Sequence, residues 1–393
     1  MTETTAARRV LVVGAGIAGM AAALRFHRDG WDVLVVERAP ARRSSGYLVN
    51  LHGPGYDAAE RLRLVPALRR RDAGFFTTVL VHADGREKLT VPAAITEAAV
   101  GTRAVNVFRG DVESVLYDAV AERVEIRFAT TVRSVTEHAD GVRAELSDGT
   151  RVDAELLIGA DGLHSGVREL VFGSGTDHLV DMRTLVAAFP LDTVPDHVPA
   201  GAGITFIGPG RTAAVMNLGP GRSSAFFTYR STDPAAEVAR GPVDALTGAF
   251  VDLGGGIAEA LAQLEHASNS AYFDAVRQVT LPRWSRGNVV LLGDAAWCVT
   301  VFAGYGAALA LHGADRLGAA VAAHGTDTPA ALAAWEAELR PEVTKRQALA
   351  RRGMARFVPP TRAHVWLSET MMRAIQLPGL RGLVRSAVRR ANN

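Results

Sequence analysis

Glycines and acids stand at the ends of apolar runs in this chain, where such residues can hold phosphate and ribose groups. The run "RRVLVV" leads into Gly14, Gly16 and Gly19, which form a G-x-G-x-x-G pattern. Between a strand and a helix, the first glycine allows the tight turn, the second lets the backbone approach a pyrophosphate, and the third allows close helix–strand packing. The helix that begins at Ile17 and Ala18 would offer its unpaired N–H groups to the phosphates.

An acid completes this unit. Glu37 follows the next apolar run, "WDVLVV", and an acid at this place can accept hydrogen bonds from both ribose hydroxyls of an adenosine. A glycine-rich turn without a ligand is the alternative for the glycines alone, but strand, turn, helix, strand and acid in this order favour dinucleotide binding. The acid predicts an unphosphorylated ribose, so the motif indicates NAD or FAD rather than NADP and leaves the first two open.

Two more acids follow apolar runs further along the chain. Asp161 lies in "GADGLHSGVR" (residues 159–168) after the run "ELLI", and Asp294 follows the run "NVVLL". A carboxylate at the carboxyl end of a parallel strand faces the binding crevice of such a sheet. For Asp161 the alternative is an N-cap of the helix expected through residues 164–171, and Arg168 pairs either with a phosphate or with a nearby acid.

The three motifs together resemble the fingerprints of the class A flavoprotein monooxygenases, the para-hydroxybenzoate hydroxylase-like family. The segments "GYLVNLHGPGYDAAERLRLVPALRRR" (residues 46–71) and "FRGDV" (residues 108–112) are most similar to the tetracycline-inactivating and antibiotic-pathway members. The resemblance implies bound FAD, transient NADPH or NADH, and O2, with a flavin hydroperoxide that oxygenates an aromatic or polycyclic secondary metabolite. A flavoprotein-fold cyclase or rearrangement enzyme, in which FAD is mainly structural, is the alternative.

The resemblance also implies which residues hold FAD. Arg38 would lie along the adenine, and the backbone of Val132 would contact it. Arg109, at the start of a helix, would reach the ribityl or phosphate portion, although a solvated helix-start residue is the alternative for it. Asp294 would accept a hydrogen bond from a ribityl hydroxyl, because a buried acid needs such a donor. The full predicted cofactor-binding set is Gly14, Gly16, Ile17, Ala18, Gly19, Glu37, Arg38, Arg109, Val132, Asp161, Asp294, Gly304, Gly306 and Ala307.

The stretch "GDAAWCVTVFAGYGAALAL" (residues 293–311) matches the family and also departs from it. Its small residues would place the N–H groups of a helix N-terminus at the flavin pyrimidine edge, where they stabilise the anionic reduced flavin. Val301 stands where the family has a proline beside the reactive carbon of the flavin. Valine restores an N–H donor and loosens the loop, so we expect FAD binding to persist and hydroxylation to be altered. The family has no universal acid or base, so no catalytic residue is predicted.

The elements between the motifs predict the architecture that positions them. The fold class is α/β: a Rossmann-type FAD-binding domain of discontinuous segments, an inserted, mainly antiparallel β-sheet substrate domain, and C-terminal helices. We expect the FAD-binding domain at residues 1–74, 102–176 and 282–340, the substrate domain at 75–101 and 177–281, and bracing helices at 341–393. On one strand of the insert, alternation puts Phe227 and Tyr229 on one face and Phe226 on the other. Neither these residues nor Asn217 is assigned to the site.

Composition excludes several other classes. The chain has 393 residues and a net charge of +2, which gives no reason to expect a nucleic-acid partner. Its single cysteine, Cys298, cannot form a disulfide framework or a cysteine-based metal site and fits a cytoplasmic protein. No metal site is expected, because the histidines lack H-x-x-x-H spacing. No apolar span of about 18 residues is uninterrupted, so no transmembrane helix is expected. The basic C-terminal helices could touch a membrane or a partner, but a solvated face is favoured, so no membrane partner is expected. The protein is expected to be a monomer or a homodimer.

Overall fold

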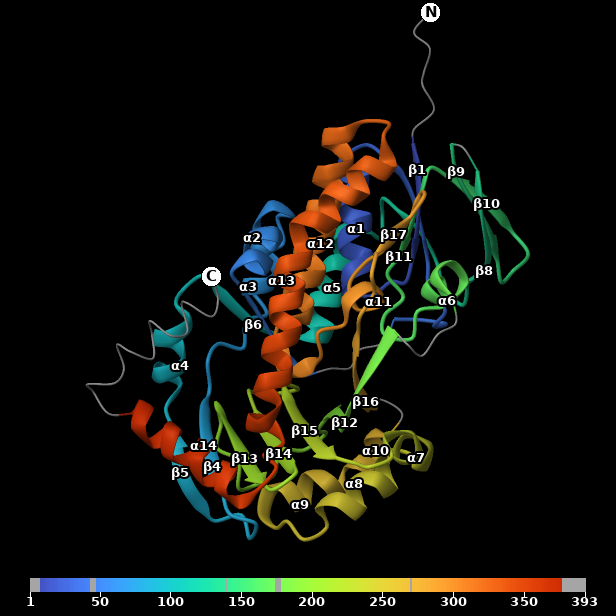
Figure 1. The fold of residues 1–393 in the computed structure, drawn as a ribbon. Helices are drawn as coiled ribbons and strands as arrows, with labels where there is room; N and C mark the ends of the chain where they lie inside the picture. Colours follow the sequence, from blue (N-terminus) through green and yellow to red (C-terminus); the bar gives the residue numbers. More distant parts are fainter. Residues whose placement is uncertain (1–7, 43–46, 139, 174–177, 269–270, 377–393) are drawn as a thin grey trace, which may run out of the picture.

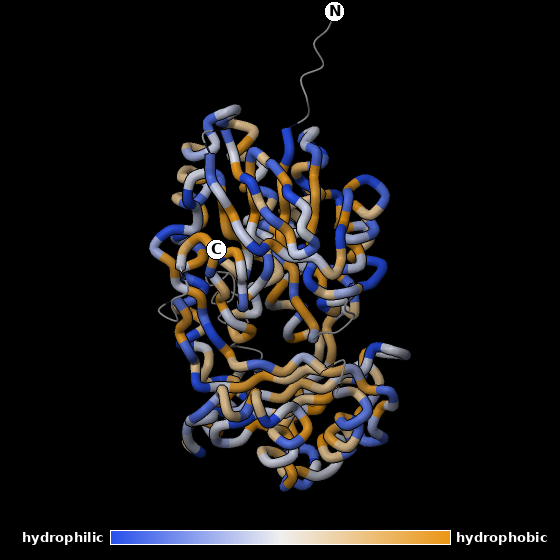
Figure 2. The backbone as a smooth tube through the Cα atoms, turned by 90° about the vertical axis from the view of Figure 1, so that its right-hand side faces the viewer, coloured by the Kyte–Doolittle hydropathy of each residue, from blue (hydrophilic) through white to orange (hydrophobic). Residues whose placement is uncertain are grey.

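The computed structural model describes residues 8–42, 47–138, 140–173, 178–268 and 271–376, and these form two stacked units (Figure 1). One unit is built around a six-stranded, mainly parallel sheet, and the other around a seven-stranded, mainly antiparallel sheet. Figure 2 shows hydrophobic residues along the strands of the sheets. The α/β fold class predicted from the sequence is confirmed.

The six-stranded sheet has the order β17-β18-β11-β1-β2-β7, and β1 pairs in parallel with both β2 and β11. Residues 10–13 and 33–36 are buried without a break, as is typical of central strands in a parallel sheet that is covered on both faces. The bounds are β1 (Arg9–Val13), β2 (Asp32–Val36), β7 (Glu125–Arg127), β11 (Leu156–Gly159), β17 (Ser285–Arg286) and β18 (Val289–Leu291).

Helix α1 follows β1 directly and packs against both α5 and α12. Helix α2 packs on α12 at very short range, because a Cβ atom at Gly55 would lie 2.3 Å from the Cβ atom of Ala308. The bounds of these helices are α1 (Ile17–Arg28), α2 (Pro54–Arg61), α5 (Arg109–Val120) and α12 (Gly306–His324).

A buried carboxylate joins three of these helices. Asp315 of α12 is 1% exposed, and it accepts hydrogen bonds from Arg25 of α1 (2.9 Å) and from Arg61 of α2 (2.6 Å). A buried carboxylate needs such cationic donors. The three residues therefore fix α1 and α2 relative to α12, whose N-terminus faces the cleft described below.

Smaller elements surround this unit. An antiparallel pair, β3 with β6, lies beside α2, and β8, β9 and β10 form a separate antiparallel sheet. The bounds are β3 (Leu48–His52), α3 (Val65–Arg69), α4 (Ala93–Val100), β6 (Ala104–Phe108), β8 (Val132–His138), β9 (Gly141–Leu146), β10 (Arg151–Ala154) and α6 (Gly166–Phe172).

The seven-stranded sheet has the order β16-β12-β15-β14-β13-β4-β5. Its pairs are antiparallel except β13 with β4, which are parallel. Its strands are β4 (Thr77–Val81), β5 (Glu87–Val91), β12 (Leu179–Pro190), β13 (Ala202–Gly208), β14 (Arg211–Asn217), β15 (Ser223–Arg230) and β16 (Tyr272–Val279).

Four helices cover the outer face of this sheet, which lies at the bottom of Figure 1. They are α7 (Pro234–Arg240), α8 (Pro242–Phe250), α9 (Gly255–Ala262) and α10 (Leu264–Ala267). The sequence pattern indicated only strands and turns in this insert, so these helices are an addition to the expected architecture. Their apolar residues, such as Leu246 and Phe250, are fully buried against the sheet.

Two long helices complete the chain: α13 (Thr328–Phe357) and α14 (Arg362–Ile375). Helix α13 runs along both units (Figure 1) and includes Pro341, so the predicted limit between residues 340 and 341 falls inside a continuous helix. The predicted segments at residues 1–7 and 377–393 lie outside the described residues. Between β18 and α12 stand two short elements, α11 (Asp294–Trp297) and η2 (Val301–Ala303).

Candidate active site

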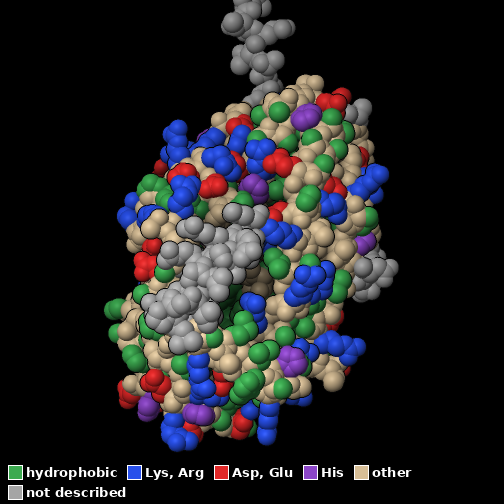
Figure 3. Space-filling view, turned by 60° about the vertical axis from the view of Figure 1, so that its left-hand side comes forward, with side chains coloured by type: hydrophobic (Ala, Val, Ile, Leu, Met, Phe, Trp, Pro, Cys, Tyr) green, Lys and Arg blue, Asp and Glu red, His purple; other side chains and the backbone are tan. Residues whose placement is uncertain are grey.

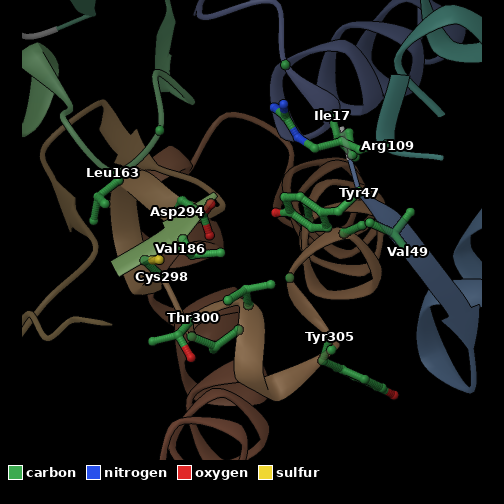
Figure 4. Close-up of a pocket in the computed structure, with 18 of the residues that line it drawn as sticks. Ile17, Tyr47, Val49, Arg109, Leu163, Val186, Asp294, Cys298, Thr300 and Tyr305 are labelled. Atoms are coloured by element: carbon green, nitrogen blue, oxygen red, sulfur yellow. The ribbon is translucent and has the colours of Figure 1, made fainter. Parts of the chain in front are cut away.

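A cleft with about 1200 Å³ of empty space opens between the two units. Its walls come from the glycine turn before α1, from residues 47–50, from the start of α5, from residues 298–307, and from strands β12 and β16 of the other sheet. Figure 3 shows a hollow at mid-height on one face of the molecule, with side chains of both charges interspersed around it. Figure 4 shows the inside of the cleft, where Ile17, Tyr47 and Arg109 face Leu163 and Asp294.

The glycine turn has the geometry that its three glycines require. Gly14 has φ +105°, and a Cβ atom there would lie 2.5 Å from the backbone oxygen of Ala160. A Cβ atom at Gly19 would lie 1.9 Å from the backbone oxygen of Gly14, so only glycine lets α1 pack here. Gly16, in contrast, would bring its Cβ atom within 4 Å of no other residue, and its φ of −78° suits any residue. The space that Gly16 leaves open therefore belongs to the cleft.

Glu37 lies just beyond β2, and its carboxylate fastens the glycine turn to the next loop. One carboxylate oxygen accepts the N–H of Ala15 (2.8 Å), and the other accepts the N–H of Ala39 (2.8 Å). Each oxygen has a further lone pair, so the two ribose hydroxyls expected here can still bind. The neighbouring Arg38 is exposed.

Val132 does not line the cleft. It is 7% exposed, begins β8 and belongs to the hydrophobic core of the first unit. Thr130, two residues earlier, donates its N–H to the backbone oxygen of Glu37 (2.9 Å). The segment thus lies next to Glu37, where the adenine end of a dinucleotide was expected, but the Val132 side chain serves packing.

Asp161 turns toward α6 and is absent from the cleft lining. Its carboxylate accepts the Ser165 hydroxyl (2.5 Å) and the N–H of Val167 (3.1 Å). Ser165 is the N-cap of α6 and accepts the N–H of Arg168 (2.9 Å). Burial raises the pKa of the Asp161 carboxyl, and these hydrogen bonds offset part of that rise. Of the two roles considered for Asp161, the geometry supports capping of the helix.

Arg168 is 4% exposed and bonds to backbone carbonyls rather than to a phosphate or an acid. Its guanidinium donates to the oxygen of Ala295 (2.9 Å) and to the oxygen of Leu163 (2.7 Å). Burial lowers the pKa of Arg168, and the charge of Asp161 raises it in part. The contacts fasten the loop before α6 to α11, so Arg168 helps to hold Asp294 in place.

Asp294 is the first residue of α11 and lies deep inside the molecule, yet its carboxylate is exposed to the cleft. In Figure 4 it faces Tyr47 across the cleft. Burial raises the pKa of the Asp294 carboxyl, and the positive charge of Arg109 offsets part of that rise. A carboxylate in this position is stabilised by a hydroxyl or N–H donor of a ligand.

The N-terminus of α12 opens onto the same cleft. Gly304 has φ +59°, and neither Gly304 nor Gly306 would bring a Cβ atom within 4 Å of another residue. Ala307, in the first turn of α12, lines the cleft with them. The positive end of this long helix therefore faces the space where a flavin edge was expected.

Arg109 is the first residue of α5 and forms an ion pair with Glu113 one turn later (2.7 Å). Its side chain is 35% exposed and lines the cleft. Burial raises the pKa of Glu113, and the charge of Arg109 lowers it in part. Arg109 is thus held by a buried acid rather than solvated at a helix start.

Eight residues of the predicted set meet in this one cleft. They are Gly16, Ile17, Ala18, Arg109, Asp294, Gly304, Gly306 and Ala307. The other six do not line the cleft. Gly14 and Gly19 allow the shape of the turn, and Glu37 bonds to its backbone. Asp161 bonds to the start of α6, Arg38 is exposed, and Val132 packs in the core.

Two tyrosines of the cleft were not predicted. Tyr47 precedes β3 and Tyr272 begins β16, and their ring centroids lie 6.1 Å apart across the junction of the two units. Burial raises the pKa of Tyr47 to about 12, with the charge of Arg109 acting against it. Tyr47 lies in the stretch that carried the family resemblance and could have been found there, whereas nothing in the sequence around Tyr272 singled it out.

The phenylalanines of β15 are now assigned to their faces. Phe227 and Tyr229 pack against Phe250 of α8 on the outer face of the sheet. Phe226 lies on the opposite face, in a small cluster with Tyr272 and Val301. Asn217 bonds to the backbone oxygen of Val198 (2.9 Å) and stabilises a turn. The sheet therefore turns an aromatic and apolar face toward the residues of the cleft.

The residues present fit FAD. The open space beside Gly16 at the N-terminus of α1 is what a pyrophosphate needs, because a side chain there would fill it. Asp294 offers an acceptor to a ribityl hydroxyl, and the N-terminus of α12 offers N–H donors. In the part of the chain that the structure describes, no group of histidine, cysteine, aspartate or glutamate residues could hold a metal ion. Within the same ranges, no helix is long and apolar enough to cross a membrane.

Comparison with known proteins identifies the family. A family model described as an FAD binding domain matches residues 7–349. The chain is 31% identical over 319 residues to the FAD-dependent monooxygenase asL4 of Sarocladium schorii. The matched region covers 78% of this chain and 74% of that protein.

Solved structures share the fold. Tetracycline destructase Tet(51) matches with a TM-score of 0.82 at 24% identity over 98% of both chains. HpxO of Klebsiella pneumoniae, solved with FAD and uric acid, matches with a TM-score of 0.79 at 22% identity, over 97% of this chain and 96% of that one. The family model and the sequence relative, together with this fold, show that the chain belongs to the FAD-binding family of class A flavoprotein monooxygenases and is an FAD-dependent monooxygenase.

Proposed function

We propose that this enzyme uses NADPH or NADH and O2 to oxygenate an aromatic or polycyclic small molecule. The observation that carries the proposal is the pairing of two surfaces in one cleft. One surface presents the N-termini of α1 and α12 with Asp294, and the other is the apolar sheet face with Tyr272 and Val186. The first surface suits a dinucleotide flavin, and the second suits a flat, apolar ring system.

We infer that FAD is held along the first surface. Gly14, Gly16 and Gly19 would seat the pyrophosphate with Ile17 and Ala18, Glu37 would bind the ribose with Arg38 and Val132 near the adenine, and Asp161 would support the loop behind. Arg109 and Asp294 would hold the ribityl chain, and Gly304, Gly306 and Ala307 would face the pyrimidine edge. FAD, when bound, accepts a hydride from the nicotinamide and passes its electrons to O2.

We infer that the residues of the cleft act by binding, by orienting and by excluding water. Among the described residues that line the cleft, none is a histidine or a lysine, and Asp294 is the one carboxylate. A carboxylate committed to a ribityl hydroxyl is a poor general base, so no catalytic acid or base is assigned. This supports a reaction whose chemistry is carried by the cofactor.

We also propose the arrangement of domains that the sequence predicted. Residues 1–74, 102–176 and 282–340 would bind FAD, residues 75–101 and 177–281 would bind the substrate, and residues 341–393 would brace both. The placement of β4 and β5 in the same sheet as β12 to β16 supports the second assignment. The enzyme would act in the cytoplasm as a monomer or homodimer, without a nucleic-acid or membrane partner.

The test is consumption of NAD(P)H and O2 with a panel of fused-ring phenols, including a tetracycline, because one of the similar structures is a tetracycline destructase. The expected result is faster oxidation of NADPH or NADH with a panel member present, and a product heavier by one oxygen atom. If no member of a broad aromatic panel stimulates oxidation or gains oxygen, the proposed reaction is wrong. If a product forms at the same rate without O2 and without flavin reduction, the cyclase or rearrangement alternative is correct.

A further inference from the structure

The turn between α11 and η2 has a backbone conformation that its sequence does not favour. Thr300 has φ +76° and ψ +157°, a region that essentially only glycine adopts, and the branched Cβ of threonine makes the strain larger. Thr300 is 6% exposed, and its hydroxyl has no hydrogen-bond partner among the described residues. A buried, unpaired hydroxyl is itself unfavourable. The chain thus keeps a residue here that lowers stability in two ways.

Three consecutive carbonyl groups hold this turn in its strained shape. The carbonyl oxygens of residues 297–299 each accept a hydrogen bond from a residue outside the turn. In chain order, the donors are the Gln347 side chain (3.3 Å), the Val279 N–H (3.2 Å) and the Gln278 side chain (3.4 Å). The turn cannot relax by rotating a peptide without breaking these bonds. Strain of this kind persists only where the surroundings fix the backbone at several points.

The two glutamines form a buried chain between β16 and α13. Gln278 of β16 is fully buried, and its amide also donates to the backbone oxygen of Gln347 (3.0 Å), while Arg351 donates to its amide oxygen (2.6 Å). Gln347 of α13 is 8% exposed, and its amide also donates to the backbone oxygen of Val279 (2.8 Å). A buried polar network with its donors paired favours one arrangement of its members. Sheet, turn and helix are therefore locked together.

The other side of the same turn faces the cleft. Cys298, Val299, Thr300 and Val301 all line it, and Figure 4 shows Cys298 and Thr300 there. The turn connects Asp294 to the N-terminus of α12, the two features assigned above to the ribityl chain and the pyrimidine edge of FAD. The position of the turn therefore sets the position of both features and of the surface between them.

Resting on the proposed function, we propose that Gln278 and Gln347 are positioning residues for oxygen transfer: they hold the strained Thr300 turn against the reactive edge of the flavin. In the productive reaction NAD(P)H supplies two electrons, one oxygen atom of O2 enters the substrate, and the other leaves as water. When the turn is displaced, the same two electrons reduce O2 to hydrogen peroxide and the substrate is unchanged. The network thus determines what share of the NAD(P)H yields product.

The variants Gln278→Leu and Gln347→Leu test this, with Gln263→Leu as the matched control. Gln263 bonds with its amide to the backbone of Thr193 (3.0 and 3.1 Å), far from the cleft. We expect the first two variants to keep FAD, to show an altered flavin absorption spectrum, and to release at least threefold more hydrogen peroxide per NAD(P)H with the stimulating substrate. The control should match the wild type. An unchanged spectrum and unchanged peroxide yield in the FAD-loaded variants would overturn the proposal.

A double-mutant cycle measured by thermal unfolding tests whether the network holds the strain of the turn. This thermal cycle needs no turnover, so it still applies if a leucine variant fails to bind FAD. Thr300→Gly should raise the melting temperature of the wild type by removing strain, and should alter the flavin spectrum. In the Gln347→Leu background the same change should raise it less, because the turn has already relaxed. Equal rises in both backgrounds would show that the network does not hold the strain. As a control, Ala129→Gly, at a residue with φ +53° away from the cleft, should raise the melting temperature by the same amount in both backgrounds.

The two proposals can fail separately. If the wild type binds FAD but oxygenates nothing, the proposed function fails, while the thermal cycle and the flavin spectrum still report on the turn. If the wild type oxygenates a substrate and the glutamine variants do so with the same peroxide yield, the positioning proposal alone is wrong.

Discussion

Replacing Gly16 by alanine separates cofactor binding from folding. Gly16 has φ −78° and ψ −175°, which alanine adopts readily, and the added Cβ atom would have no protein atom within 4 Å. At Gly19 the same change would place the Cβ atom 1.9 Å from the backbone oxygen of Gly14. The two glycines belong to one motif, yet one leaves room for a ligand and the other leaves room for the protein itself.

The magnitudes follow from this difference. Gly16→Ala should change the free energy of unfolding of the FAD-free protein by no more than about 1 kcal/mol, from cap preference and chain entropy. A methyl group forced into a filled binding site costs about 1–3 kcal/mol, as overpacking does, which corresponds to roughly 5- to 150-fold weaker FAD binding. Gly19→Ala should instead destabilise the FAD-free protein by about 1–3 kcal/mol or more, because backbone must move.

Thermal unfolding with and without FAD measures both quantities. Bound FAD stabilises the folded state in proportion to the logarithm of its concentration over Kd, so each tenfold loss of affinity removes about 1.4 kcal/mol of that stabilisation. We expect Gly16→Ala to melt like the wild type without FAD and to gain much less from added FAD. If Gly16→Ala gains as much as the wild type, the pyrophosphate does not lie beside Gly16 and the assignment of the cleft is refuted.

Three further predictions concern the acids and the arginine that hold the site. Asp294→Asn should weaken FAD binding but stabilise the FAD-free protein at neutral pH. Burial raises the pKa of this carboxyl above its ordinary 3.8, so its ionisation lowers the stability of the FAD-free wild type as the pH rises from 3.8 to the raised pKa. The melting temperatures of the FAD-free variant and wild type should therefore agree at acid pH, and the variant should melt increasingly higher than the wild type as the pH rises. Arg168→Met should lower the free energy of unfolding by about 2–4 kcal/mol, because two charge-assisted bonds to the carbonyls of Ala295 and Leu163 are lost. Urea unfolding measures this free energy, and a loss below about 0.5 kcal/mol, as a neutral surface substitution gives, would count against the prediction. Asp315→Asn should lower the free energy of unfolding by about 1–3 kcal/mol, because the charge-assisted bonds from Arg25 and Arg61 are weakened, while Arg25 keeps its ion pair with Asp29 and Arg61 stays half exposed; an unchanged denaturation midpoint would show that this group does not join the helices.

The sequence predicted the parts of the site that depend on backbone shape. Gly14 has a positive φ and Gly19 packs on the backbone oxygen of Gly14, so both need glycine for reasons close by in the chain, whereas Gly16 leaves space for a ligand. The strand before Asp294 and the helix after Gly306 follow from local hydrophobic runs. Such features are visible in one sequence because the physical cause lies next to the residue concerned.

Contacts between distant segments were not predictable in this way. Asp161 follows an apolar run in the sequence as Asp294 does, yet it bonds to Ser165 and Val167 at the start of α6 while Asp294 faces the cleft. Tyr272 meets Tyr47 because two units come together, and helices α7 to α10 fold in a part of the insert where no helix was expected. The turn at Thr300 is bonded through the Trp297 carbonyl to Gln347, which is far along the chain on another helix. Tertiary packing decides each of these.

Labelled oxygen tests most directly whether the cleft carries out oxygen transfer. The enzyme is incubated with NADPH or NADH, 18O2 and the panel compound that most stimulates oxidation, and the product is analysed by mass spectrometry. We expect one 18O atom in the product, with formation abolished when O2 is absent. A product that carries no label, or that forms equally well without O2, would contradict the claim that this cleft joins a flavin to an aromatic substrate for oxygen transfer.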